Sequence, residues 1–337
     1  MTQGSERFLV TGALGCIGAW TVCALMREGA QVTALDVGRD VRRLRLIMSD
    51  EELARVDLEV GDITDLASIE RIIDDRGVTN VIHLAALQVP FCRADPPRGA
   101  LVNVVGTVNM FEAVRRRAER MAPVVYTSSI AVFDAADADP TSGRLMTSAA
   151  SHPPNHYGVY KQANEGNARI YWQDQGLSSI GLRPMTVYGV GRDQGMTSGP
   201  TKAIVASVLR RPYQVSFDGP TLYQYVEDVA RTLVAASRSS LEGARVYNMP
   251  GVIADGPAIA AAIEAVVPAA ADVIGFEPGD LPFPFEIDHD GIEALGPLPV
   301  TPLADGIAAS VAIYRRLADE GRLDPAEHGL EPIAAAR

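Results

Sequence analysis

The stretch RFLVTGALGCIG, residues 7–18, decides the fold. Its apolar beginning is typical of a buried β-strand, and glycines follow at positions 12, 15 and 18. In a turn from strand to helix, Gly12 would allow the tight bend, Gly15 would let a ligand approach the backbone, and Gly18 would let the helix pack closely on the strand. The stretch therefore predicts a strand, a glycine-rich turn and a helix in direct succession.

Short apolar segments alternate with helical patterns through the rest of the first half of the chain. These segments are QVTALD (31–36), VDLEVGD (56–62), NVIHLAA (80–86), PVVYTSS (123–129) and SSIGLRP (178–184). They are apolar almost without interruption, which indicates burial on both faces and is typical of a parallel sheet between helices. We therefore predict an α/β protein with a doubly wound parallel sheet.

The alternation ends near residue 188, where a glycine-rich loop, further helices and a proline-rich segment follow. A chain of 337 residues is long enough for a nucleotide-binding domain with a smaller addition. We predict a nucleotide-binding domain over residues 1–188, to which a segment at about 224–250 returns. Residues 189–223 and 251–337 are predicted to form a smaller C-terminal substrate lobe.

Composition and charge narrow the class of partner. The net charge of -12 opposes binding to nucleic acids and to anionic lipid surfaces. The polar N-terminus has no export signal, the most apolar later region is interrupted by charges and prolines, and the three cysteines have no metal-site spacing. We expect a cytoplasmic protein without a membrane span, a nucleic-acid partner or a structural metal.

Two carboxylates follow predicted strands at positions where a dinucleotide would lie. Asp36 ends the second strand and could accept hydrogen bonds from the adenosine ribose, which favours NAD over NADP because a 2'-phosphate would meet a like charge. Arg39 stands close enough to compensate, and a helix cap is the alternative for Asp36. Asp62 could bind the adenine amino group or could cap the helix that begins at Leu66.

Tyr157 and Lys161, in HYGVYKQ (156–162), are four residues apart and would share one face of a helix. A tyrosine ordinarily titrates near 10, and an adjacent ammonium with a positively charged nicotinamide ring would lower that pKa towards neutrality. A compact ammonium suits this place better than a guanidinium, because it can donate to ribose hydroxyls beneath the phenol. We predict Tyr157 as a base, with a surface pair as the alternative.

A serine at the end of the fifth predicted strand would complete this group. Ser129 or Ser128 would lie at the carboxyl edge of the sheet, where ligands of doubly wound folds bind. A hydroxyl there could hold a substrate oxygen while the tyrosine takes its proton. The alternative for both serines is a strand end that satisfies backbone groups.

Together these features resemble the extended short-chain dehydrogenase/reductase family, the group of NAD-dependent epimerases and dehydratases. The matching motifs are TGALGCIG (11–18), GDIT (61–64), HLAA (83–86), NVVGT (103–107), YTSSIAVF (126–133), Tyr157 with Lys161, and LRPMTVYG (182–189). The resemblance covers roughly the first 190 residues. It implies a Rossmann fold, a homodimer, a bound NAD, and Ser129, Tyr157 and Lys161 as catalytic residues. The cofactor contacts that it implies are Gly12, Gly15, Cys16, Ile17, Gly18, Asp36, Asp62, Ile63, Leu84, Ala85, Ala86, Asn103, Tyr157, Lys161, Pro184 and Val187.

Two departures from the family pattern concern the ligands. Cys16 replaces an aromatic residue that is usual in the glycine loop. Thr221 stands about where nucleotide-sugar members carry an arginine for the diphosphate, which weakens a nucleotide-sugar substrate. Arg192 could replace that charge, could bind a small carboxylate, or could be a surface loop residue. The candidate substrate residues are Gln88, Ser128, Ser129, Arg192, Thr197 and Ser198.

Three functions compete. The leading hypothesis is an NAD-dependent oxidoreductase that removes hydride from a secondary alcohol of a small sugar-like or sugar-acid substrate while Tyr157 removes the proton. The alternative is a nucleotide-sugar epimerase or dehydratase, in which the hydride returns within one turnover. A cofactor-sensing regulator without catalysis would have no need of Ser129, Tyr157 and Lys161 together.

Overall fold

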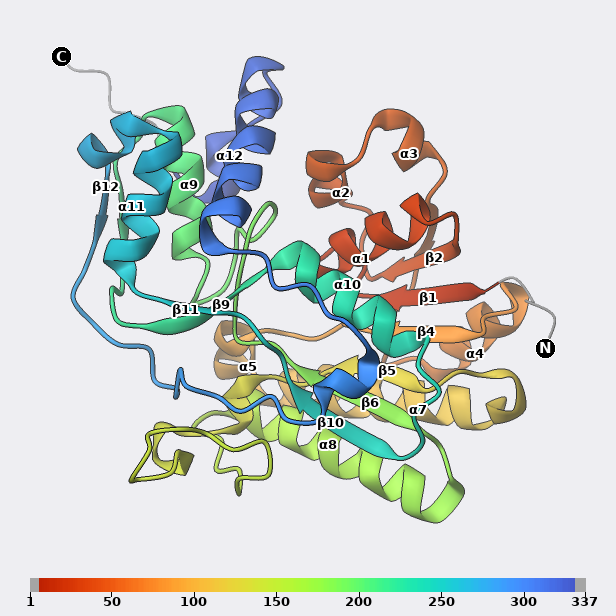
Figure 1. The fold of residues 1–337 in the computed structure, drawn as a ribbon. Helices are drawn as coiled ribbons and strands as arrows, with labels where there is room; N and C mark the ends of the chain where they lie inside the picture. Colours follow the sequence, from red (N-terminus) through yellow and green to blue (C-terminus); the bar gives the residue numbers. More distant parts are fainter. Residues whose placement is uncertain (1–5, 331–337) are drawn as a thin grey trace.

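The computed structural model describes residues 6–330, so the outer ends of the two predicted lobes, 1–5 and 331–337, lie outside the described residues. Its centre is a seven-stranded parallel sheet in the order β10-β6-β5-β4-β1-β2-β3 (Figure 1). The strands are β1 (Arg7–Thr11), β2 (Gln31–Asp36), β3 (Asp57–Val60), β4 (Asn80–His83), β5 (Val124–Thr127), β6 (Ser179–Arg183) and β10 (Ala244–Asn248). Strand order reverses between β1 and β4, which confirms the predicted doubly wound sheet.

Helices cover both faces of this sheet (Figure 1). One face carries α1 (Cys16–Arg27) and α10 (Val226–Ser237), and the other carries α4 (Leu66–Asp75), α7 (Gly106–Arg115) and α8 (His156–Gln175). In β1, Phe8 and Val10 join the core beneath α1 and α10, whereas Leu9 joins the core beneath α4 and α7. Burial of each such side chain contributes about 1.5–3 kcal/mol, which explains why the strands are apolar throughout.

The second half of the chain adds smaller sheets and a helical layer beside the main sheet. Strands β7 (Thr186–Tyr188), β9 (Thr221–Tyr225) and β11 (Val252–Ala254) form one small sheet, and β8 (Tyr213–Val215) pairs with β12 (Ile274–Phe276). Besides α10, the longer helices of this half are α9 (Gly199–Leu209), α11 (Gly256–Val266) and α12 (Leu303–Asp319). Both α10 and β10 fall within the segment expected to return at 224–250, and they pack on α1 and β6. The division of the chain into cofactor and substrate lobes stays a prediction.

Short helical segments fill the connections. They are α2 (Arg42–Ile47), α3 (Asp50–Ala54), α5 (Val89–Ala94), α6 (Pro96–Ala100), a π-helical turn at Leu101–Val105, and 3-10 turns at Ala118–Arg120, Ile130–Val132, Ala135–Asp137, Pro268–Asp272, Ile292–Leu295 and Pro325–His328. Among residues 6–330, no helix is both long and apolar enough to cross a membrane.

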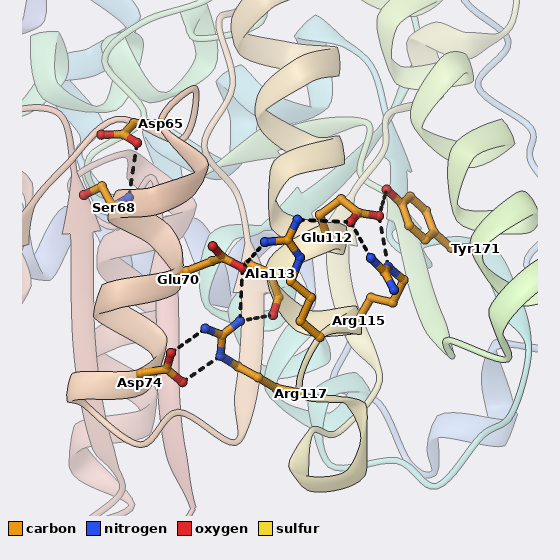
Figure 2. Close-up of polar contacts among 10 residues, drawn as sticks. Asp65, Ser68, Glu70, Asp74, Glu112, Ala113, Arg115, Arg117 and Tyr171 are labelled. Carbon is orange, nitrogen blue, oxygen red and sulfur yellow. Dashed lines mark hydrogen bonds and ion pairs between the residues drawn. The ribbon is translucent and has the colours of Figure 1, made fainter.

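Ion pairs tie the helices on one face to each other. Arg117, just beyond α7, donates to both carboxylate oxygens of Asp74 on α4 and to the carbonyl oxygen of Ala113, as Figure 2 shows. Glu112 on α7 accepts a hydrogen bond from the Tyr171 hydroxyl of α8 at 2.9 Å. These contacts hold α4, α7 and α8 together as one layer on the face of the sheet opposite α1 and α10.

Candidate active site

A cleft of about 670 Å³ lies at the carboxyl ends of the central strands and collects most of the predicted site residues. Those that line it are Gly12, Gly15, Cys16, Ile17, Gly18, Asp36, Asp62, Ile63, Leu84, Ala85, Ala86, Gln88, Ser128, Ser129, Tyr157, Lys161, Pro184, Val187, Arg192 and Thr197. Asn103 and Ser198 are the two predicted site residues outside its lining. The volume is in the range of small-molecule and cofactor sites.

The glycine loop leaves room for a ligand only on its cleft side. A Cβ on Gly12, whose φ is +65°, would lie 2.7 Å from the backbone nitrogen of Ala85, and one on Gly18 would lie 2.1 Å from the oxygen of Gly12. A Cβ on Gly15 would meet that same oxygen at 3.1 Å and no further atom within 4 Å outside its own helix and chain neighbours in the described chain. Gly15 is also the N-cap of α1, which has no side-chain cap and no acidic residue in its first turn. These residues fit a pyrophosphate, because free N–H groups and the helix dipole face the open side.

Asp36 is held in place by two backbone groups. Its oxygens accept hydrogen bonds from the N–H groups of Leu14 at 2.9 Å and Val37 at 2.8 Å. Each carboxylate oxygen retains a lone pair that could accept from a ribose hydroxyl. The alternative of a helix cap is wrong, since α2 begins at Arg42 with Val41 as its N-cap.

The alternative for Asp62 is also wrong. Asp65 is the N-cap of α4, where its side chain accepts from the N–H of Ser68 at 3.2 Å (Figure 2). Asp62 instead accepts from the N–H of Thr64 at 2.9 Å one turn earlier. The expected contact of Asp62 with adenine stays a prediction.

Sequence reasoning missed a buried polar chain behind the HLAA segment. Thr107 donates its single hydroxyl proton to the oxygen of Asn103 at 2.8 Å, so its oxygen must accept from His83 Nε2 at 3.0 Å. Burial lowers the pKa of His83 to about 3, so the ring is neutral and Nδ1 accepts from the Thr11 hydroxyl at 2.7 Å. That hydroxyl oxygen also accepts from the two N–H groups that follow His83, at 3.2 Å each. The chain fixes the end of β4 against the glycine loop.

Two predicted residues support the cleft from behind. The Asn103 amide accepts from the N–H of Leu87 at 2.7 Å and donates to the oxygen of Leu87 at 2.9 Å, so it holds the loop after β4. The Ser198 hydroxyl donates to the oxygen of Gly195 at 2.8 Å. Cys92 is buried and donates to the oxygen of Leu87 at 3.3 Å.

The N-terminus of α8 brings the predicted catalytic side chains together. Asn155 caps the helix by accepting from the N–H of Gly158 at 3.0 Å. A Cβ on Gly158 would lie 2.0 Å from the oxygen of Ala131, so only glycine allows α8 to approach the turn after Ser129 this closely. Tyr157, in the first turn of α8, and Ser129 both line the cleft, and the Ser129 hydroxyl opposes the rise in the pKa of the phenol.

Lys161 lies beneath this pair and is 4% exposed. Its ammonium donates to the oxygen of Thr127 at 2.7 Å and lies 5.6 Å from the centre of the Tyr157 ring. Burial lowers the pKa of Lys161 to about 8. Ser129, Tyr157 and Lys161 therefore share one wall of the cleft.

The pKa of Tyr157 does not move in the expected direction in the protein alone. Burial raises it above its ordinary value, and the Ser129 hydroxyl and the charge of Arg192 oppose that rise. The protein's own groups do not supply the lowering that a base near pH 7 needs, because the cost of burying a phenolate outweighs them.

Ser128 belongs to a second network that the sequence did not reveal. Its hydroxyl donates to Glu165 of α8 at 2.5 Å, and Arg183 pairs with both oxygens of the same carboxylate at 2.7 and 2.6 Å. The guanidinium of Arg183 also stacks 4.7 Å from the ring centre of Phe133 and donates to Asn248 at 3.3 Å. The hydroxyl of Ser128, a predicted substrate residue, thus faces Glu165.

The loop between β7 and α9 places Arg192 in the cleft with little compensation. Its one hydrogen bond in the described chain joins Nη2 to the Thr197 hydroxyl at 3.3 Å, and its Nε is buried without a partner. The adjacent Asp193 pairs instead with Arg43 at 2.7 Å. A Cβ on Gly195 would lie 2.5 Å from the Gln88 amide oxygen and 3.1 Å from Arg192 Nη2, so these two side chains converge.

Thr221 does not provide the cation that its position would carry in nucleotide-sugar members. It is fully buried on β9, where its hydroxyl is hydrogen-bonded to that of Thr186 at 2.9 Å. Thr221 is also outside the set of residues that line the cleft, so its side chain is not presented to a ligand there.

Comparison with known proteins agrees with this geometry. Residues 8–249 match the profile of the NAD dependent epimerase/dehydratase family. A UDP-glucose 4-epimerase from Mycolicibacterium smegmatis is 32% identical over 318 residues, which cover 92% of this chain and 98% of that protein. The structure of a Thermus thermophilus UDP-glucose 4-epimerase in complex with NAD superposes with a TM-score of 0.75 and 26% identity, covering 92% of this chain and 99% of that one. An L-threonine dehydrogenase from Cupriavidus necator shares the fold, with a TM-score of 0.77, 24% identity and coverage of 91% and 99%. With the family's motifs in the cleft and its profile matched over most of the length, this chain belongs to the NAD dependent epimerase/dehydratase family.

Proposed function

We propose that this enzyme is an NAD-dependent oxidoreductase that takes hydride from a secondary alcohol of a small sugar-like or sugar-acid substrate, with Tyr157 as the base. The observation that carries the proposal is the shared wall of the cleft, where Tyr157 and Ser129 lie together and the Lys161 ammonium stands 5.6 Å from the centre of the Tyr157 ring. A phenol, a hydroxyl and a cation at one wall are what alcohol oxidation requires from a protein.

Each of these residues has a separate task. The Ser129 hydroxyl would orient the substrate hydroxyl towards Tyr157, which takes its proton. The Lys161 ammonium would donate to ribose hydroxyls, and its pKa of about 8 keeps it mostly charged at neutral pH. Bound NAD would supply the hydride acceptor and a positive ring charge, which opposes the effect of burial on the phenol. We propose that the remaining predicted cofactor contacts, from the glycine loop to Val187, also bind NAD, because they lie in or directly behind the same cleft.

An acidic substrate is supported by Arg192. Its guanidinium is partly buried, its charge lowers the pKa of Tyr157, and no described carboxylate pairs with it. A partly buried cation without a counter-ion favours an anionic ligand, and the planar fork suits a carboxylate. Gln88 and Thr197, which lie beside Arg192, could bind further oxygen atoms of the substrate.

A nucleotide-sugar 4-epimerase is the second candidate. The relative that favours it carries that activity in its name and is covered over 98% of its length at 32% identity. In that reaction the hydride would return to the opposite face of the same carbon. Buried Thr221, in place of a cation for the diphosphate, argues for the smaller substrate.

Product analysis separates the two candidates. Purified protein with NAD would be incubated with sugar acids, neutral sugars and nucleotide sugars, while NADH absorbance and stereoisomers are followed. We expect NADH to accumulate with a small acid. Turnover confined to nucleotide sugars, with new stereoisomers and no NADH, would replace the proposal with the epimerase.

The base is tested by Tyr157→Phe. We expect turnover to fall about 10²–10⁴-fold with unchanged stability, because the proton acceptor is lost while the ring remains. Tyr160→Phe is the matched control, since Tyr160 lies on the same helix but donates to the oxygen of Pro96. Full activity in Tyr157→Phe would rule out the base. The homodimer, the cytoplasmic location and the preference for NAD over NADP stay predictions.

A further inference from the structure

We propose that Asp193 sets the cofactor preference of the cleft by occupying the arginine that would otherwise receive the 2'-phosphate of NADP. The proposal rests on the dinucleotide site proposed above. It adds a specificity residue that lies 150 positions from Arg43, the residue on which it acts.

Arg43 and Asp36 meet at one residue of the glycine loop. The Leu14 N–H donates to Asp36 Oδ2 at 2.9 Å, and Arg43 Nη1 donates to the Leu14 carbonyl oxygen at 3.1 Å. Both side chains line the cleft. The guanidinium of Arg43 and the carboxylate expected to hold the ribose hydroxyls are therefore bound to the two backbone groups of the same residue, Leu14.

An arginine beside the ribose-binding carboxylate is the group that accommodates a 2'-phosphate in dinucleotide folds. In this protein the rest of the Arg43 fork is already occupied. Its Nε and Nη2 donate to Asp193 Oδ1 at 3.1 and 2.7 Å, and Arg42 Nη2 lies 3.4 Å from Asp193 Oδ2. The Asp193 carboxylate thus gives Arg43 an internal anion in place of one from a ligand.

The position of Asp193 does not depend on a ligand. On its N-terminal side, Trp20 Nε1 donates to the oxygen of Val190 at 2.9 Å, and the N–H of Gly191 donates to the Tyr314 hydroxyl at 3.1 Å. The Asp193 side chain is 4% exposed. Releasing Arg43 to a phosphate would leave this carboxylate buried beside Arg42 alone, which opposes the exchange.

The test measures binding rather than turnover. Dissociation constants of NAD and NADP would be determined by calorimetry for the wild type and for Asp193→Asn, which keeps the shape and removes the charge. We expect the affinity for NADP relative to NAD to rise about tenfold in Asp193→Asn, because a charge-assisted bond to Arg43 becomes available. NAD should remain preferred, since Asp36 is unchanged.

Two further variants identify the cause. In Asp193→Asn with Arg43→Ala the gain should disappear. Asp40→Asn is the matched control, since Asp40 also lines the cleft but its carboxylate lies 3.4 Å from Arg42 and forms no hydrogen bond or ion pair with Arg43 in the described chain. A similar gain in Asp40→Asn would assign the effect to overall charge and overturn the proposal.

Arg43→Ala alone keeps the test decisive even if Asp193→Asn folds poorly. Its affinity for NADP relative to NAD should not rise, because the gain requires a free guanidinium at position 43. A rise like that expected for Asp193→Asn would overturn the proposal, as would an unchanged ratio in folded Asp193→Asn. A wild type that binds neither dinucleotide would instead remove the proposed cofactor site itself.

Discussion

Arg183 and Arg192 lie on the two sides of β7, one before the strand and one after it, and their surroundings are opposite. Arg183 has a bidentate carboxylate partner in Glu165, an amide partner in Asn248 and an aromatic ring against its face. Within residues 6–330, Arg192 has one long hydrogen bond, to Thr197, and a buried nitrogen without a partner.

This difference separates a charge that is paired within the fold from a charge that is available to the anionic substrate proposed above. A buried charge is tolerated when its hydrogen bonds are satisfied inside the protein. Arg183 meets that condition without any ligand, and Arg192 does not. The first network joins β5, β6, α8 and β10, whereas the second residue faces the cleft.

The largest effect on stability is expected at the first arginine. Arg183→Met should lower the free energy of unfolding by about 3–5 kcal/mol, because the Glu165 carboxylate loses its partner while buried. Urea unfolding would measure it. Adding Glu165→Gln should restore part of the loss, and a loss below about 1 kcal/mol in Arg183→Met would show that the two arginines do not differ as described.

Arg192→Met should change activity and leave stability alone. We expect kcat/KM for an acidic substrate to fall about 100-fold, or roughly 2.7 kcal/mol of transition-state binding, with unfolding changed by about 0.5 kcal/mol or less. A neutral substrate analogue is the control, and its turnover should change little. Equal losses for acidic and neutral substrates would contradict the ligand role.

The smallest expected effect comes from another unsatisfied group beyond β7. His328 is buried, and neither of its ring nitrogens has a hydrogen-bond partner among the described residues. Its ring packs edge-on against that of Tyr314, with the ring centres 5.5 Å apart. Burial lowers its pKa to about 4, and the charges of Asp193, Arg42, Lys202 and Asp324 modify that shift. The unfolded chain takes up this proton below pH 6.5, so stability is lost as the pH falls from about 6.5 towards 4.

His328→Phe should remove that loss. At pH 5 the variant is expected to be more stable than the wild type by about 2 kcal/mol, whereas at pH 8 the linkage contribution vanishes. Urea unfolding at both pH values would measure the difference. A gain of equal size at both would point to packing and not to proton uptake.

The fold could be predicted because its signals are local. The glycine loop, the apolar strands and the i, i+4 spacing of Tyr157 and Lys161 each depend on a few neighbouring residues. The polar partnerships could not be predicted, because they depend on which distant segments meet. Asp193 and Arg43 become neighbours only when the loop after β7 meets the first turn of α2.

Local ambiguity explains why a helix cap stood as the alternative for Asp62. Asp62 and Asp65 lie in one turn before α4, and both residues are suitable N-caps. The chain enters the helix at Leu66, which places Asp65 and not Asp62 beside the free N–H of Ser68. The spacing of residues in the sequence cannot place the start of a helix to within one turn, so it cannot decide between these two caps.

The contact between α8 and the turn after Ser129 limits which substitutions the site can accept. Position 158 must lack a side chain, since a single carbon there would overlap the oxygen of Ala131. The approach of α8, which carries Tyr157, to the turn after Ser129 therefore depends on the absence of a side chain at position 158. Residues that line the cleft can change and alter its ligand, but glycine at position 158 cannot be replaced without moving α8 away from this turn.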